Sequence, residues 1–190
     1  MLSIPKKDYS AFLYDCDGTL ADTMAPHAQA WVEELARHGL TIEAALIYEL
    51  AGMPAIKTVI ELNRRFGTTL DPESIAASKE QRFLNEYMTK IEPIHAVVDH
   101  LKASFGKAKI AVVSGGRTKV VNRTLSLLGI ADMVEVVICA EDVKHGKPHP
   151  EPFLMAAERL GVAPETCLVF EDGELGIQSA IAAGMDFVRV

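Results

Sequence analysis

Two aspartates, Asp15 and Asp17, directly follow an apolar run at residues 11–14 and are themselves followed by Gly18 and Thr19. The run has the composition of a buried strand, and open α/β sheets bind their ligands at the carboxyl ends of such strands. Carboxylates at i and i+2 in that position are suited to nucleophilic attack and to general acid–base catalysis. The plainer alternative is a strand-to-turn junction, because Asp and Gly are common turn residues.

Three later parts of the chain place further reactive residues after strand-like runs. The second run ends at Ser114 and Gly115, Lys147 lies in the loop after the third, and the fourth ends at Glu171 and Asp172. Each feature has an ordinary alternative: a turn for the serine, a solvated loop for the lysine, and a turn with a helix cap for the two acids. Their joint occurrence after successive strands favours one site at one edge of a sheet.

Four carboxylates around a single lysine would repel one another, so this site requires a cation. Oxygen-only ligands, together with room for phosphate oxygens, favour Mg²⁺ over zinc or copper. An EF-hand loop beginning at Asp15 is excluded, because Leu20 occupies the place of its glycine and Pro26 that of its bidentate glutamate. The chain also lacks a P-loop and a strand-linked G-x-G-x-x-G motif, which excludes the usual nucleotide-binding loops.

A carboxylate beside Mg²⁺, a lysine and a hydroxyl group is equipped to attack phosphorus. At ~4 Å a carboxylate and a phosphate dianion repel each other by about 8 kcal/mol when the effective dielectric constant is about 20. This repulsion corresponds to about five to six powers of ten in rate, so the cation and the lysine are conditions for the reaction. A second acid could protonate the leaving alkoxide and then deprotonate the water that hydrolyses the acyl phosphate.

Composition and charge limit the protein classes that fit this chain. The formal net charge of −7 argues against general binding to nucleic acids or anionic membranes. The cysteines, Cys16, Cys139 and Cys167, lie in or beside apolar strand-like runs, which predicts buried thiols in a reducing compartment. No signal-peptide pattern opens the chain, and no apolar run approaches the ~18 residues of a spanning helix. We expect a soluble, monomeric, cytoplasmic protein.

The hydrophobic periodicity predicts an α/β fold with a Rossmann-like parallel five-stranded sheet and helices on both faces. The strand-like runs are residues 11–14, 109–114, 134–139, 167–170 and 186–190. Between the first two runs the periodicity is helical, with one helix ending at Gly39 and others at 44–50, 55–66 and 72–88. We therefore predict a core domain of residues 1–21 and 92–190 and an inserted α-helical cap domain of residues 22–91.

These motifs resemble, in order and context, the four sequence motifs of the haloacid dehalogenase superfamily. The residues that carry the resemblance are Asp15-Cys16-Asp17-Gly18-Thr19, Ser114, Lys147-Pro148 and Glu171-Asp172. The resemblance covers nearly the whole chain. The insertion after the first strand is similar to that of the group that contains β-phosphoglucomutases and small sugar phosphatases such as fructose-1-phosphatase. One departure is Cys16, where a larger apolar residue is usual.

The resemblance implies that Asp15 is the nucleophile and Asp17 the general acid and base, and that Ser114, Gly115 and Lys147 bind the phosphoryl group. Because a dehalogenase would lack the second aspartate, Asp17 favours phosphoryl transfer. The resemblance also implies a Mg²⁺ site formed by Asp15, the main-chain carbonyl of Asp17 and Asp172, with Glu171 close by.

Selectivity for the leaving group is expected to come from the cap, because the strand-end residues are occupied with the phosphoryl group and the metal. His27 lies on the first cap helix, Gly52 begins a break between two helices, and Lys57 follows that break. Lys79 begins the polar face of the last cap helix. By position these residues resemble the family's cap residues that meet the substrate. The alternative for His27 and both lysines is a solvated helix surface.

The leading functional hypothesis is a Mg²⁺-dependent phosphatase of a small phosphorylated metabolite, such as fructose 1-phosphate, that acts through an aspartyl phosphate. A β-phosphoglucomutase-type mutase would use the same intermediate, although the related mutases tend to have an apolar residue where this chain has Thr19. A third hypothesis is a catalytically idle binding protein on the same scaffold, which the presence of all motif acids disfavours.

Overall fold

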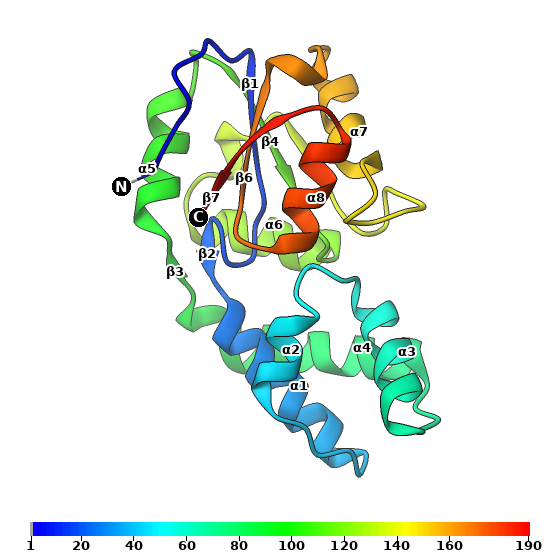
Figure 1. Ribbon diagram of the computed structural model, residues 1–190. Helices are drawn as coiled ribbons and strands as arrows, with labels where there is room; N and C mark the ends of the chain where they lie inside the picture. Colours follow the sequence, from blue (N-terminus) through cyan, green and yellow to red (C-terminus); the bar gives the residue numbers. More distant parts are fainter. Residues whose placement is uncertain (1) are drawn as a thin grey trace.

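Five parallel strands form the sheet at the centre of the computed structural model, which describes residues 2–190 (Figure 1). The order of the strands is β5–β4–β1–β6–β7, so β1 lies in the middle, between β4 and β6. The strands are β1 (Ala11–Tyr14), β4 (Lys109–Val113), β5 (Val136–Ile138), β6 (Cys167–Glu171) and β7 (Asp186–Arg189). The parallel pairing brings the residues after β1, β4 and β6 to one edge of the sheet.

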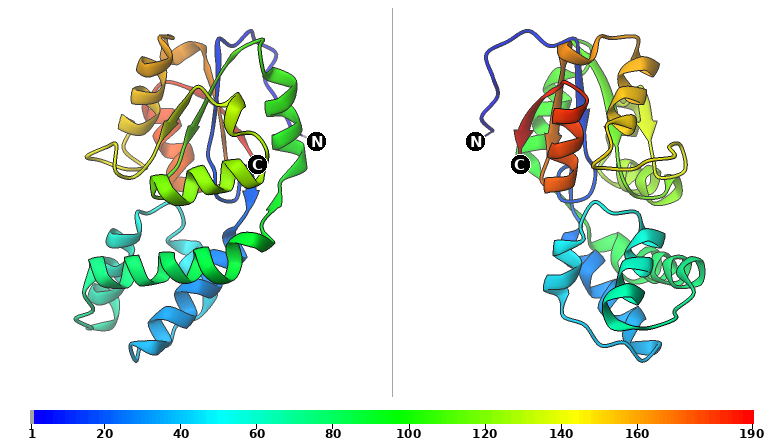
Figure 2. Two further views of the ribbon diagram at one scale, coloured as in Figure 1. Left: turned by 180° about the vertical axis from the view of Figure 1, so that it is seen from behind. Right: turned by 45° about the vertical axis from the view of Figure 1, so that its right-hand side comes forward.

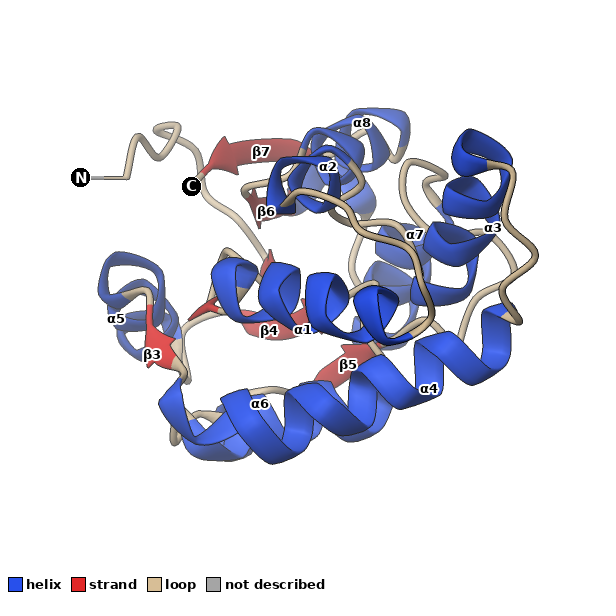
Figure 3. Ribbon diagram, turned by 90° about the horizontal axis from the view of Figure 1, so that it is seen from below, coloured by secondary structure: helices blue, strands red, loops and turns tan. Residues whose placement is uncertain are grey.

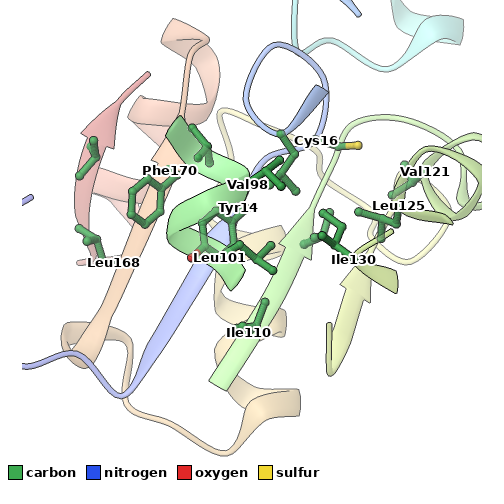
Figure 4. Packing of buried hydrophobic residues seen from close by; sticks show 14 of the residues in the cluster. Tyr14, Cys16, Val98, Leu101, Ile110, Val121, Leu125, Ile130, Leu168 and Phe170 are labelled. Carbon is green, nitrogen blue, oxygen red and sulfur yellow. The ribbon is translucent and has the colours of Figure 1, made fainter. Parts of the chain in front are cut away.

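Side chains of the central strands alternate between two buried faces, as the pleat of a strand requires. In β1, Leu13 packs on one face and Tyr14 on the other, where the Tyr14 ring stacks on Phe170 at 4.8 Å between centroids (Figure 4). Helices α5 and α6 cover the Tyr14 face, and α7 and α8 cover the Leu13 face (Figure 2). These helices are α5 (His95–Ser104), α6 (Thr118–Leu127), α7 (Glu151–Leu160) and α8 (Glu174–Ala182). The predicted fold class is therefore confirmed.

A group of helices between β1 and β4 lies beyond the carboxyl edge of the sheet, at the bottom of Figure 1. It contains α1 (Met24–Arg37), α2 (Ala44–Glu49), α3 (Ala55–Phe66) and α4 (Pro72–Arg82). We call residues 24–90 the helical module. It has a hydrophobic cluster of its own around Trp31, Leu35 and Leu62. Figure 3 shows α1 beside α4 within this module, and the two helices are in contact.

A two-stranded ribbon joins the helical module to the sheet. Strand β2 (Ala21–Asp22) pairs antiparallel with β3 (Glu92–Pro93), and Ala21 faces Pro93. The sequence did not predict this ribbon, because strands of two residues carry no measurable periodicity and proline is rare in strands. The ribbon lies where the sequence placed the boundaries between core and cap, and the division into those two domains remains a prediction.

The helix after α3 ends earlier than its sequence pattern predicts. The expected helix runs to residue 88, whereas α4 ends at Arg82 and a π-helical turn, η1 (Phe83–Tyr87), follows. Short 3₁₀ helices occur at η2 (Met88–Lys90), η3 (Ala131–Met133) and η4 (Pro164–Thr166). Helical periodicity does not distinguish a π turn from an α-helix over so short a length, so only the structure shows the change of winding.

The predicted burial of the thiols is confirmed, because Cys16, Cys139 and Cys167 are buried and free. Over residues 2–190, the structure contains no helix with the length and hydropathy needed to cross a membrane.

Candidate active site

Asp15 follows the last residue of β1 and is buried against Lys147 and Glu171. Its backbone N–H donates to the carbonyl oxygen of Phe170 and extends the pairing of β1 with β6 by one residue. The Nζ atom of Lys147 lies 2.6 Å from Asp15 Oδ1 and 2.5 Å from Glu171 Oε2. Lys147 therefore links the ends of two neighbouring strands through its ammonium group.

Negative charge exceeds positive charge in this buried cluster. Burial, together with the charge of Glu171, raises the pKa of Asp15 well above its usual value. Burial alone would lower the pKa of Lys147. The negative charges of Asp15 and Glu171 outweigh burial, so they raise this pKa and keep the ammonium protonated. Burial and the charge of Glu171 also raise the pKa of Asp172. One lysine cannot neutralise three carboxylates, so the site favours a bound cation.

The carboxylates of Asp15, Glu171 and Asp172 have oxygen atoms that all lie within 4.8 Å of one another. Thr19 Oγ1 donates to Asp172 Oδ1 at 3.1 Å and holds that carboxylate in place. A Cβ on Gly18, which has φ of +85°, would overlap the Asp172 carboxylate. Buried oxygen donors with excess negative charge fit Mg²⁺ as the sequence predicts, and these three residues are the ones whose side chains would hold it.

Asp17 has different partners from Asp15, although the two residues are neighbours on the same loop. Its Oδ1 atom lies 2.7 Å from Thr23 Oγ1 and 3.1 Å from His27 Nε2. Burial would raise the pKa of Asp17, but the hydrogen bonds from His27 and Thr23, with the positive charge of Lys79, lower it to about 2. The carboxylate is not a member of the three-carboxylate group, so the metal-ligand role of Asp17 through its main-chain carbonyl remains a prediction.

Ser114 lies at the end of β4, on the same edge of the sheet as Asp15. Its backbone N–H donates to Ile138, and its Oγ accepts a hydrogen bond from the N–H of Gly116 at 3.0 Å. The helical module approaches closely here, because a Cβ added to Gly115 would lie 3.0 Å from the carbonyl oxygen of Gly52. Glycine at position 115 therefore permits the Gly52 turn to lie against the strand end.

Lys79 is not a solvated helix residue, the alternative to its predicted place at the substrate, because the structure buries it to 8% exposure. Its Nζ atom lies 2.7 Å from His27 Nδ1 and 5.3 and 5.4 Å from the ring centroids of Trp31 and Phe83. The negative faces of these rings stabilise the ammonium and replace part of its hydration. Burial nevertheless lowers the pKa of Lys79 to about 8.

Two adjoining cavities separate the helical module from the strand ends. The smaller, of about 130 Å³, contains Asp15, Asp17 and Gly52 in its wall, opposite a group of apolar side chains: Met24, Trp31, Ile47, Leu50 and Met53. The larger, of about 640 Å³, is lined on its two sides by Lys57 and Lys147. His27, Lys79, Ser114 and Gly115 lie on both cavities. Every predicted site residue thus lines at least one of the two cavities, and Lys57 is exposed beside the larger one.

Two residues that contact the site were not identified from the sequence. Thr23 is the N-cap residue of α1, and the sequence indicates only a helix start there, whereas its hydroxyl donates to Asp17 and makes no capping bond. Phe83 stacks on the His27 ring with centroids 3.8 Å apart and planes at 11°. An aromatic residue at helical spacing usually indicates a core position, so no sequence signal pointed to this contact.

Comparison with known proteins assigns the chain to a family. The sequence matches the family model of the haloacid dehalogenase-like hydrolases over residues 9–184. It is 37% identical over 185 residues to fructose-1-phosphate phosphatase YqaB of Escherichia coli K12, with 96% of each chain covered. It is 34% identical to hexitol phosphatase A of the same organism, over 94% of this chain and 82% of the relative.

Solved structures agree with this assignment. A β-phosphoglucomutase from Clostridium difficile superposes with a TM-score of 0.79 at 27% identity, over 94% of this chain and 83% of that one. A hydrolase from Pseudomonas syringae has the same fold, with a TM-score of 0.85 at 23% identity over 94% and 83% of the two chains. The chain therefore belongs to the haloacid dehalogenase-like hydrolase family and, within it, to the phosphoric monoester hydrolases.

Proposed function

We propose that the protein is a Mg²⁺-dependent phosphatase of a small sugar phosphate, such as fructose 1-phosphate, and that it acts through an aspartyl phosphate. The observation that carries the proposal is the contrast between Asp15 and Asp17 at one strand end. Asp15 lies against the Lys147 ammonium, and Asp17 is hydrogen-bonded to Thr23 and His27. Two carboxylates in such different surroundings are suited to different steps. The similarity to a fructose-1-phosphate phosphatase and to a hexitol phosphatase supports the substrate class.

In the proposed first step, an Asp15 carboxylate oxygen attacks phosphorus and the bond to the sugar oxygen breaks. Asp15, Glu171 and Asp172 would hold a Mg²⁺ ion, which would supply the positive charge that offsets the repulsion between the carboxylate and the phosphate dianion. Lys147 and the Ser114 hydroxyl bind the phosphoryl oxygens, and Gly115 provides room beside them. Support for these roles comes from the lining of the larger cavity, which includes all three residues, and from the burial of Lys147 and Ser114.

Asp17 serves both steps by changing its protonation. Its pKa of about 2 means that the carboxylate is ionised in the free protein, which is the form required of a general base. An arriving phosphate dianion opposes this charge and raises the pKa of Asp17, so the carboxyl can carry a proton to the leaving sugar oxygen. After the sugar departs, ionised Asp17 takes a proton from water, and that water attacks the acyl phosphate and releases inorganic phosphate.

The helical module is proposed to bind the leaving group, with Gly52, Lys57, Lys79 and His27 around it. Support comes from the cavities, whose walls on that side are formed by these residues and by apolar side chains. A small phosphorylated metabolite fits a space of this size better than a macromolecule does. A monomeric state and a cytoplasmic location remain predictions from the sequence.

A phosphosugar mutase is the second candidate, and the similarity to a β-phosphoglucomutase structure favours it. Hydrolysis remains our leading proposal, because the motif residue Thr19 is polar and the 37%-identical relative carries a phosphatase name. A panel of phosphorylated sugars and hexitols, assayed for inorganic phosphate with Mg²⁺ and with EDTA, tests the proposal. We expect metal-dependent phosphate release from at least one ketose or hexitol phosphate. Isomerised sugar phosphate without free phosphate would support the mutase, and no reaction at all would support the idle binding protein.

A further inference from the structure

We propose that Phe83 is a positioning residue that keeps His27 aligned on Asp17, so that the proton needed for catalysis is carried by one oxygen of Asp17. The inference rests on the proposed role of Asp17 as general acid and base. Phe83 lies at the first position of the π turn that follows α4, and its side chain is completely buried. π turns occur frequently at functional sites, which is consistent with a role for the residue that begins this one.

The imidazole ring of His27 is held at three places. Its Nε2 atom lies 3.1 Å from Asp17 Oδ1, and its Nδ1 atom lies 2.7 Å from Lys79 Nζ. Its face stacks on the Phe83 ring at 3.8 Å with an interplanar angle of 11°. The two hydrogen bonds fix the edge of the ring, whereas the stacking contact restricts rotation of its plane. Phe83 is thus the contact that keeps both nitrogen atoms directed at their partners.

The identity of the partners assigns the tautomer of His27. A lysine ammonium has donors and no acceptor, so Nδ1 must accept from Lys79. The proton of neutral His27 then lies on Nε2, which donates to Asp17 Oδ1. Thr23 Oγ1 also donates to Oδ1, at 2.7 Å. Because two donors occupy Oδ1, the Oδ2 atom, on the side of Gly116, is the oxygen left to give and take the catalytic proton.

The surroundings of Phe83 hold its ring from behind. It packs in a buried cluster with Ala30, Met88 and Val120, so α1, η2 and α6 all contribute to its position. Its ring also lies 5.4 Å from the Lys79 ammonium, one helical turn earlier. One aromatic ring therefore fixes the plane of His27 and stabilises the cation that sets the His27 tautomer.

Steady-state kinetics of four variants test this role: Phe83→Leu, Met88→Leu, His27→Ala and the double variant Phe83→Leu/His27→Ala. Met88→Leu is the matched control, because it changes the same buried cluster at a near-constant volume. We expect Phe83→Leu to lower kcat by ~10-fold, which is ~1.4 kcal/mol at the transition state, with KM changed less than ~2-fold. Met88→Leu should change kcat by less than ~2-fold.

The double variant decides whether Phe83 acts through His27. Once His27 is replaced, adding Phe83→Leu should lower kcat by less than ~2-fold. If Phe83 acts only by positioning His27, its replacement has little effect when His27 is absent. Phe83 also borders the larger cavity, so direct contact with the substrate is the competing explanation. A full ~10-fold loss in the His27→Ala background would overturn the proposal in favour of substrate contact or general stability.

A measurement without substrate separates this inference from the proposed function. Nitrogen NMR of the histidine side chains should show His27 in the Nε2–H form in the wild-type protein and in Met88→Leu. In Phe83→Leu the ring-proton shifts of His27 should move downfield, because the stacked ring above them is lost. A wild-type Nδ1–H tautomer, or unchanged His27 shifts in Phe83→Leu, would overturn the inference even if phosphatase activity is present.

Discussion

The sheet edge and the helical module form the two walls of the same site, and they are built in different ways. At the sheet edge, Lys147 forms short ion pairs with buried carboxylates at the ends of two strands. In the helical module, Lys79 is buried between aromatic rings and Lys57 is exposed at the side of the larger cavity. At the sheet edge a buried lysine therefore contacts opposite charges, whereas in the helical module a buried lysine contacts the faces of aromatic rings.

This difference separates chemistry from selectivity. Charged groups within ~4 Å of each other in a buried site interact strongly, so small changes at the sheet edge should alter every reaction of the enzyme. The wall of the helical module contains Trp31, Ile47 and Leu50, whose contacts depend on the shape of the leaving group. Variants of the two walls should therefore differ in whether they affect all substrates or only the larger ones.

The largest effect is expected from Asp15→Asn, at the centre of the sheet-edge wall. The amide is nearly isosteric with the carboxylate but is a poor nucleophile, so phosphate release should fall by at least ~10³-fold on sugar and aryl phosphates alike. Circular dichroism should show an unchanged fold. If the variant kept a tenth of the wild-type rate or more, another residue would have to be the nucleophile.

A large effect on stability as well as activity is expected from Lys147→Met. The variant leaves Asp15 and Glu171 buried without their shared cation, and breaking such a buried pair typically costs about 3–5 kcal/mol. Thermal unfolding should show a lower Tm, part of which Mg²⁺ should restore because it replaces positive charge beside the same carboxylates. Lys144→Met, an exposed neighbour on the same loop, is the control and should leave Tm nearly unchanged. Equal Tm values for both variants would mean that the buried ion pairs do not stabilise the fold.

His27→Ala tests whether His27 acts in the acid–base step or in selectivity for the leaving group. The sequence grouped it with Lys57 as a selectivity residue, but the hydrogen bond to Asp17 connects it to the acid–base step. We therefore expect a loss of kcat of ~30-fold, within the range of general acid–base effects, on a sugar phosphate and on a small aryl phosphate. A loss confined to the sugar phosphate would show that His27 acts in selectivity and not in the acid–base step.

The smallest effect, and the most selective, is expected from Lys57→Gln. This exposed residue borders the larger cavity. Within residues 2–190, no ion pair joins Lys57 to a strand-end acid. We expect kcat/KM for the sugar phosphate to fall by ~10-fold and that for an aryl phosphate to change by less than ~2-fold. Lys102→Gln on α5, also exposed, serves as the control. Equal losses on both substrates would show that Lys57 is not a selectivity residue.

The sequence predicted the sheet-edge wall better than the helical wall, for physical reasons. Strand periodicity and the parallel crossover rule were enough to bring Asp15, Ser114 and Glu171 to one edge. The boundaries of α3 also matched, because Gly67, a glycine with positive φ, ends this helix.

The helical wall depends on contacts between distant residues that periodicity does not encode. Lys79 contacts His27 across 52 positions of the chain, and its burial depends on the ring faces of Trp31 and Phe83. A lysine on a helix is normally a surface residue, so the sequence alone left a solvated Lys79 open as the alternative to a place at the substrate. The β2–β3 ribbon was missed because each of its strands has two residues.

Nucleophilic attack by Asp15 is tested most directly by looking for the covalent intermediate on this residue. The Mg²⁺-loaded enzyme is mixed with excess fructose 1-phosphate, or with the best substrate of the panel, and quenched in acid within one turnover. Peptide mass mapping of the quenched protein should locate a phosphoryl group on Asp15, and its amount should rise before inorganic phosphate reaches its steady rate. Phosphate released at the full rate with Asp15 unmodified at every time point would contradict nucleophilic attack by this residue and, with it, the proposed mechanism.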